Sequence, residues 1–159
     1  MTIDVLRTQL GFSHYTVNAN CEGVGHDESL ESSAGASPFN WVLGHIVGAR
    51  HGMRRILGLE GATWSDDEKA IYARGSSLDA SRALPLGRLL ADFNTAQEQI
   101  LERLGKLTAD ELGAPCPDVL SGEDSTVGVQ LGTLVFHECY HAGQLGVLRR
   151  GLSKAGAIR

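Results

Sequence analysis

The spacing of apolar residues along the chain predicts four long helices and almost no strand. The first is expected from Ile3 to Cys21, where apolar side chains recur every three or four residues, as on one face of a helix. The same criterion predicts helices from Pro38 to Leu57, from Pro85 to Leu104 and from Val127 to Arg150. Four amphipathic helices of this length are typical of a bundle, so we expect an all-α fold built as a four-helix bundle.

The connections between these helices are rich in Gly, Ser, Pro and Asp. Ser37 is expected to cap the second helix, with Pro38 in its first turn. The connection from Glu60 to Ala83 is unusually long for a compact domain, a feature often associated with function, and we expect one helical turn around Asp67 to Arg74. The stretch from Thr108 to Thr126 is expected to be irregular.

Helical projection of the second helix places His45 on its apolar side, together with Trp41 and Met53. The same projection places Arg50, His51, Arg54 and Arg55 on other sides of the helix. It predicts that His51 faces water.

The strongest chemical signal is the run His137-Glu138-Cys139-Tyr140-His141 in the fourth helix. Its two histidines lie one turn apart, about 5–6 Å between Cβ atoms, in the middle of an apolar stripe, which suits two imidazoles on one metal ion. Imidazole binds Zn, Ni, Cu or Fe(II), so the residue type does not name the ion. The letters also match the HExxH motif of zinc proteases. Residues 142–159 contain no His, Asp or Glu as a downstream third ligand, which disfavours a protease.

The third ligand is expected to be His45, because it is the other histidine predicted to lie in mid-helix on an apolar face. His14 is a weaker candidate, since it lies off the main stripe of the first helix. Three histidines leave coordination positions open, as in catalytic zinc sites. The alternative is that these are separate, hydrogen-bonded core histidines. A shared cation is favoured because it satisfies three inward imidazoles at once.

Three further residues are site candidates. Glu138 lies about 100° around the helix from His137. It is a candidate general base for a metal-activated water, a hydrogen-bond acceptor for a ligand N–H, or an ion-pair partner for Arg149 or for another helix; the last two roles are favoured. Gln144 and Gln130 flank the histidine pair and are candidates for orienting a ligand or a bound cofactor.

Composition narrows the class of protein. The length fits one domain over residues 1–159, and 42% hydrophobic with 21% charged residues is ordinary for a soluble globular chain. A net charge of -5 without a dense basic patch argues against nucleic acid as a partner. We find no secretory signal and no run of about 20 apolar residues. The three cysteines lack CxxC spacing, and we therefore expect reduced thiols in a cytoplasmic protein that does not bind membranes.

Two blocks of the sequence resemble the DinB family with its YfiT-like members. One is Ser37-Pro38-Phe39-Asn40-Trp41-Val42-Leu43-Gly44-His45-Ile46, and the other is His137-Glu138-Cys139-Tyr140-His141-Ala142-Gly143-Gln144-Leu145-Gly146. The second is similar to the family's H-x-x-x-H-x-G-Q pattern. The resemblance implies an up-down-down-up four-helix bundle, a metal triad of His45, His137 and His141, and frequently a homodimer.

The family also frames the functional hypotheses. The first is a metal-dependent enzyme acting on a small molecule, either a hydrolase or a transferase of a low-molecular-weight thiol such as bacillithiol, with zinc or nickel as the ion expected first. Arg50 and Arg149 are then candidates for binding an acidic substrate. The alternatives are a non-catalytic metal- or ligand-binding dimeric bundle, and a structural dimer in which the histidines have no present role.

Overall fold

The computed structural model describes residues 2–32, 35–59, 61, 64–116 and 123–158. Four long helices dominate it: α1 (Ile3–Cys21), α3 (Phe39–Ile56), α5 (Leu86–Leu104) and α7 (Val127–Gly151). Four short helical elements lie in the connections, and they are α2 (His26–Ser29), α4 (Asp66–Ile71), the 3₁₀ helix η1 (Ala80–Arg82) and α6 (Ala109–Gly113). Within the described ranges there is no strand, which confirms the predicted all-α bundle.

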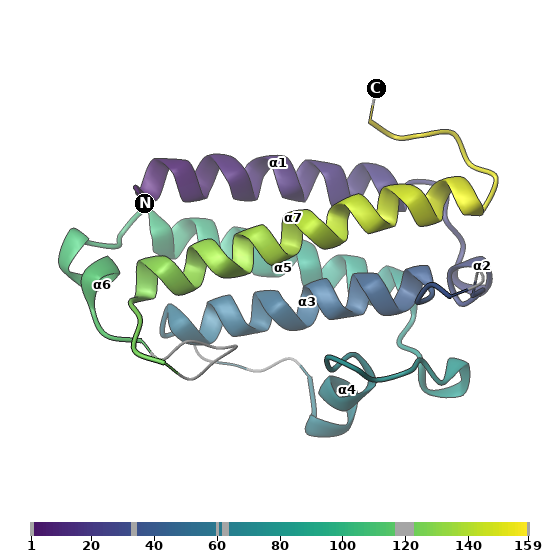
Figure 1. Cartoon of the computed structure of the whole chain (residues 1–159), viewed down its shortest axis with the longest axis horizontal. Coiled ribbons are helices and arrows are strands. Elements are labelled where there is room, and N and C mark those ends of the chain that lie inside the picture. The colour runs from purple at the N-terminus through teal and green to yellow at the C-terminus, as the bar shows by residue number, and fades with distance from the viewer. Residues whose placement is uncertain (1, 33–34, 60, 62–63, 117–122, 159) are drawn as a thin grey trace.

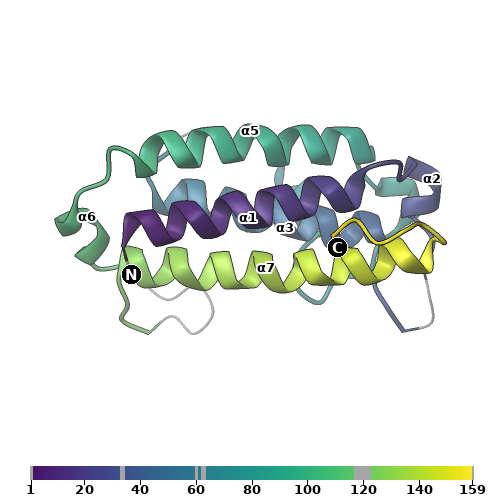
Figure 2. The ribbon, with the colours of Figure 1, turned by 90° about the horizontal axis from the view of Figure 1, so that it is seen from above.

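The long helices follow the up-down-down-up order that the family resemblance implied. In Figure 1, α1 and α7 run in one direction, whereas α3 and α5 run in the other. Seen from above, the four helices lie along one common axis (Figure 2). Helix α7 packs against α1 and α3, and α5 packs against the same two helices. Because α3 and α5 are parallel, the connection between them has to return along the bundle, and it carries α4 and η1 on the way.

The core consists of two apolar clusters separated by a polar layer. On α1, Leu6 and Leu10 belong to one cluster and Val17 and Cys21 to the other, with the buried Ser13 between them. The other long helices repeat this arrangement. Each has a buried polar side chain near the boundary between its two apolar groups, and we call the four residues together the polar layer: Ser13, Arg50, Gln97 and Glu138.

Several expectations for α3 and the connections were wrong. Arg50 and Arg54 are buried, at 0% and 6% exposure, and His51 is half-buried against the ring of Trp64. Helical projection assumes a single core face, but α3 contacts α5, α7 and residues of the connection that follows it. The helix begins after Pro38 without a side-chain cap from Ser37.

The two short helices α2 and α6 occur where loops were expected. Helix α6 begins with a capping box, in which Thr108 and Glu111 each accept a hydrogen bond from the other's backbone N–H. Among the described helices, none combines the length and the apolar character needed to cross a membrane. Cys21, Cys116 and Cys139 are free thiols, and burial raises the pKa of Cys21 to about 12, which leaves it unreactive.

Candidate metal centre

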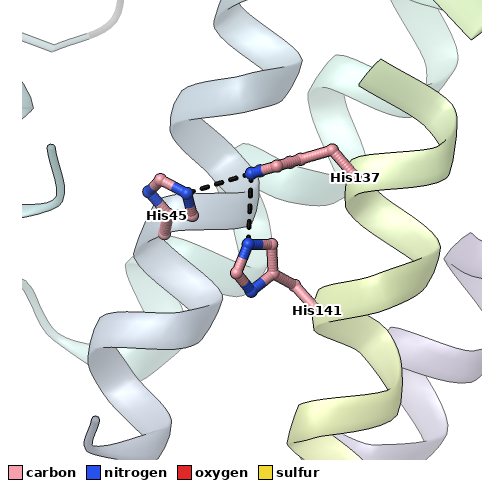
Figure 3. A group of neighbouring side chains, drawn as sticks. All are labelled: His45, His137 and His141. Atoms are coloured by element: carbon pink, nitrogen blue, oxygen red, sulfur yellow. Dashed lines mark hydrogen bonds between the residues drawn. The ribbon is translucent and has the colours of Figure 1, made fainter. Parts of the chain in front are cut away.

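The three histidines expected to form a site lie together between α3 and α7 (Figure 3). The Nε2 atom of His137 lies 3.0 Å from Nε2 of His45 and 3.1 Å from Nε2 of His141. One ring nitrogen from each residue can be chosen so that all three atoms lie within 4.8 Å of one another. The side chains are partly buried, and they point toward one another across the gap between the two helices.

Hydrogen bonds on the outer nitrogens fix the tautomers of two of these rings. His45 Nδ1 lies 2.8 Å from the backbone carbonyl oxygen of Tyr72, and His141 Nδ1 lies 2.6 Å from Oε1 of Gln144. Both oxygens can only accept, so both Nδ1 atoms must donate. Each Nε2 atom therefore carries a lone pair directed at His137.

This arrangement fits a divalent cation better than a set of hydrogen bonds. Nε2 of His137 can donate one proton, so it can satisfy His45 or His141 but not both. The remaining contact would bring two lone pairs together. A metal ion about 2.0–2.1 Å from each nitrogen, with angles between tetrahedral and right-angled, places the nitrogens about 2.9–3.4 Å apart. The separations of His137 from His45 and from His141, 3.0 and 3.1 Å, fall within that range, and the three ligand atoms all lie within 4.8 Å of one another.

The protonation state of the site also suits metal binding. Burial, reinforced by the neighbouring His141 and His45, lowers the pKa of His137 to about 4. Burial likewise lowers the pKa of His141, although its hydrogen bond to Gln144 acts in the opposite direction. Neutral imidazole is the form that binds metals, so these two rings are ready to coordinate at neutral pH.

A close approach between α3 and the following connection holds His45 in place. An ideal Cβ atom on Gly44 would lie 2.2 Å from Cδ1 of Tyr72, so only glycine lets this ring rest against α3. The Tyr72 hydroxyl donates to Asn40 Oδ1 and accepts from the backbone N–H of Leu84. The connection is thereby tied to α3 beside His45.

Aromatic rings pack around the histidines. The Trp41 ring stacks on His45 with centroids 4.8 Å apart and an interplanar angle of 10°. The Tyr140 ring meets His141 edge-on with centroids 5.1 Å apart. These contacts restrict the rotation of both imidazoles.

Glu138 lies in the core, paired with Arg50. Its two carboxylate oxygens accept from Nε and Nη2 of Arg50, each at 2.8 Å, and both side chains are fully buried. Ser13 Oγ donates to Oε1 of Glu138 at 2.5 Å. The guanidinium also lies over the Phe93 ring, 3.5 Å from its centroid, and donates to the Phe93 carbonyl. Of the roles considered for Glu138, the structure shows the ion pair with another helix.

The remaining site candidates fall in different places. Gln144 orients His141, whereas Gln130 donates to Ser125 near the start of α7. His14 stacks on Phe93, apart from the three-histidine group. Arg149 donates to backbone carbonyls, including that of Asn20, and so ties the end of α7 to the end of α1. The carbonyl of Tyr72 was not predicted, because a backbone atom leaves no residue-type signal.

A cavity of about 1030 Å³ opens beside the histidines. All three line it, together with both tryptophans of the chain and Tyr72. Neither Glu138 nor any other Asp or Glu is among the described residues of its wall. A small molecule could therefore reach an ion held by the histidines, and the walls it meets are aromatic and basic.

The chain is thus a helical bundle with up-down-down-up topology. Its candidate metal centre is formed by three histidines beside a cavity. The sequence profile of the DinB superfamily matches residues 17–145, a span that includes all three histidines. The chain therefore belongs to the DinB superfamily. A search of the curated proteins found no match to it.

Proposed function

We propose that this DinB-superfamily chain is a metal-dependent enzyme acting on a small molecule, as a hydrolase or as a transferase of a low-molecular-weight thiol. The observation that carries the proposal is the convergence of three Nε2 atoms on the wall of a large cavity. A divalent ion, zinc or nickel, held there by His45, His137 and His141 would act as a Lewis acid and lower the pKa of a bound water or thiol.

The chain's own residues supply orientation. The Tyr72 carbonyl and Gln144 hold the rings of His45 and His141 with their lone pairs toward the cavity. Arg50 and Glu138 join α3 to α7 through the core and so keep the two ligand-bearing helices in register. In this proposal Glu138 is a positioning residue, because its carboxylate is occupied by Arg50 and Ser13.

The second candidate function is a metal- or ligand-binding bundle without catalysis, and one observation favours it. The described wall of the cavity has no carboxylate that could act as a general base. Exposed aromatic side chains on α1 and α7 support a homodimer in either case: Phe12 is 72% exposed, Tyr15 62% and Phe136 72%. Helices α1 and α7 pack against each other, and large apolar side chains exposed on adjacent helices are a feature of interfaces.

Metal content tests the proposal first. The protein, purified without a histidine tag, is expected to carry about one equivalent of metal. Zinc or nickel at about 100 times its Kd should stabilise the fold by about 2.7 kcal/mol. His45→Ala and His141→Ala should abolish this gain, whereas His26→Ala, in α2 outside the cavity, should retain it. Absence of both metal and thermal stabilisation in the wild type would overturn the site.

Turnover then separates the two functions. The loaded protein is tested with activated esters and with electrophiles offered together with a panel of low-molecular-weight thiols. Turnover that is lost in His137→Ala supports the enzyme. Stoichiometric metal binding without turnover of any ester, or of any combination of electrophile and thiol, supports the metal- or ligand-binding function without catalysis.

A further inference from the structure

The cavity beside the histidines carries a charge opposite to that of the whole chain. The chain has 19 acidic and 14 basic residues and a net charge of -5. Four basic residues nevertheless line the cavity, and no acidic residue does so within the described part of its wall. We call these four residues the cationic wall: Arg54, Arg55, Lys69 and Arg74.

The cationic wall comes from two segments that meet only in the folded chain. Arg54 and Arg55 lie in the last turn of α3, and Lys69 and Arg74 lie in and just after α4. Arg54 is buried at 6% exposure, whereas the other three are exposed at the rim. Two separate segments thus bring positive charge to one cavity.

Within the described residues, no carboxylate forms an ion pair with Arg55 or Arg74, the two exposed arginines of the cationic wall. Glu68 pairs with Arg88 at 2.7 Å, and Asp92 accepts from Trp64 Nε1 and lies 3.8 Å from Arg88. Lys69 pairs with Asp66, but the Asp66 side chain is 99% exposed, so water screens that pair. Among the described residues, Glu68 and Asp92 are therefore held by Arg88, and Asp66 is solvated at the surface.

The rest of the cavity is apolar and aromatic. Trp41, Trp64 and Tyr72 line it, together with Leu59 and Leu134. Flat rings of this kind favour an apolar or aromatic body. A volume of about 1030 Å³ is at the upper end of the usual size for small-molecule sites.

We propose that the cavity binds an organic anion, with its carboxylate or phosphate group on the cationic wall and its apolar body along the aromatic residues toward the histidines. Arginine provides the planar donor pairs that both kinds of anion accept. This inference names a substrate class for the proposed metal-dependent enzyme, and it rests on that proposed function for the claim that the bound anion is a substrate. The preference for anions itself depends on the cationic wall.

The test compares three probes of similar shape: phenylacetate, phenyl phosphate and the neutral phenylacetamide. The two tryptophans of the chain both line the cavity, so their fluorescence reports occupancy, and isothermal titration gives the affinity. We expect both anions to bind metal-loaded protein about tenfold more tightly than the amide, as one charge-assisted hydrogen bond allows. Added salt should reduce this preference.

Matched substitutions locate the anion. Arg55→Gln and Arg74→Gln change exposed side chains and should leave the far-ultraviolet spectrum and the metal content unchanged. Each should reduce the anion preference at least threefold, and the double variant should abolish it. Arg82→Gln, an exposed residue of η1 outside the cavity, should retain the full preference.

Removal of the metal distinguishes failure of this inference from failure of the proposed function. A preference that persists in chelator-treated protein and disappears in the arginine variants supports the cationic wall. A preference that disappears with the metal but survives the arginine substitutions means that the anion binds the ion, which overturns this inference and leaves the metal function standing. Equal binding of the three probes, or binding of none, also overturns it.

Discussion

His137 and Glu138 are neighbours in α7, yet they belong to two polar clusters with opposite properties. Glu138 lies in the polar layer, where both carboxylate oxygens and the guanidinium of Arg50 find partners inside the protein. His137 lies at the cavity wall, where its Nε2 meets two other nitrogens and only one of the contacts can be a hydrogen bond. The ion pair of Arg50 and Glu138 is satisfied without a ligand, whereas the histidine group leaves nitrogen lone pairs that a cation could accept.

The difference shows how a structural polar cluster is distinguished from a functional one. Four buried polar residues, one from each long helix, set the register of the bundle in the middle of its core. The histidines instead keep coordinating atoms at the surface of a cavity. The five residues His137 to His141, which match a protease motif in sequence, thus contribute both to the candidate metal centre and to a buried ion pair. Substitutions in each cluster should have separable effects.

The largest effect is expected from Glu138→Ala. It leaves the Arg50 guanidinium buried without its counter-charge, and it should lower the free energy of unfolding by about 3–5 kcal/mol, measured by urea denaturation. The double variant Arg50→Met/Glu138→Leu removes both charges and should recover most of that loss. A loss below about 1 kcal/mol in the single variant would show that the polar layer does not stabilise the fold as argued.

Gln144→Leu should act on metal affinity and leave the core intact. Removing the oxygen that accepts from His141 Nδ1 frees the ring to turn, so affinity for zinc should fall about 10–100-fold, measured by competition with a chelator. Gln144→Glu keeps an acceptor at the same place and should restore most of the affinity. If both variants bind zinc like the wild type, Gln144 does not orient the ligand.

Gly44→Ala tests the support behind His45. The added methyl group would overlap the Tyr72 ring, which should cost about 1–3 kcal/mol of stability and weaken metal binding through the displaced Tyr72 carbonyl. Gly48→Ala is the matched control in the same helix, because no atom lies within 4 Å of its added Cβ. It should stabilise the protein by about 0.5–1 kcal/mol. Equal thermal stability of the two variants would contradict the close approach.

The smallest effect concerns pH. Burial, and next the nearby Arg50, lower the pKa of His14 in the folded state, whereas in the unfolded chain it titrates near pH 6.5. The unfolded chain therefore binds more protons, and stability should fall as the pH decreases below about 6.5, by less than about 1.4 kcal/mol per pH unit for one histidine. His14→Phe keeps the ring against Phe93 and should flatten this dependence in urea titrations with chelator present. An unchanged slope would show that His14 makes no contribution.

The long helices could be predicted because apolar periodicity is a local property. The predicted bounds of α1 agree with the structure, and α5 and α7 differ from prediction by one residue at one end. Helices α2 and α6 are too short to show a period, although the capping box of Thr108 and Glu111 was a readable signal for α6.

The histidine group could be predicted because three inward histidines stand out in otherwise apolar faces. The burial of Arg50 could not, since its partner lies 88 residues along the chain and no helical projection contains that information. The cationic wall was missed for the same reason, because the long connection brings Lys69 and Arg74 to the end of α3 only after folding.

The parallel course of α3 and α5 has an evolutionary consequence. The connection that it requires contributes Trp64, Lys69, Tyr72 and Arg74 to the cavity, while the three candidate metal ligands come from the long helices α3 and α7. Insertions and exchanges in a surface connection are tolerated at little energetic cost. Changes at the positions of this connection that do not support His45 can therefore alter the lining of the cavity while the helices that carry the three histidines stay the same.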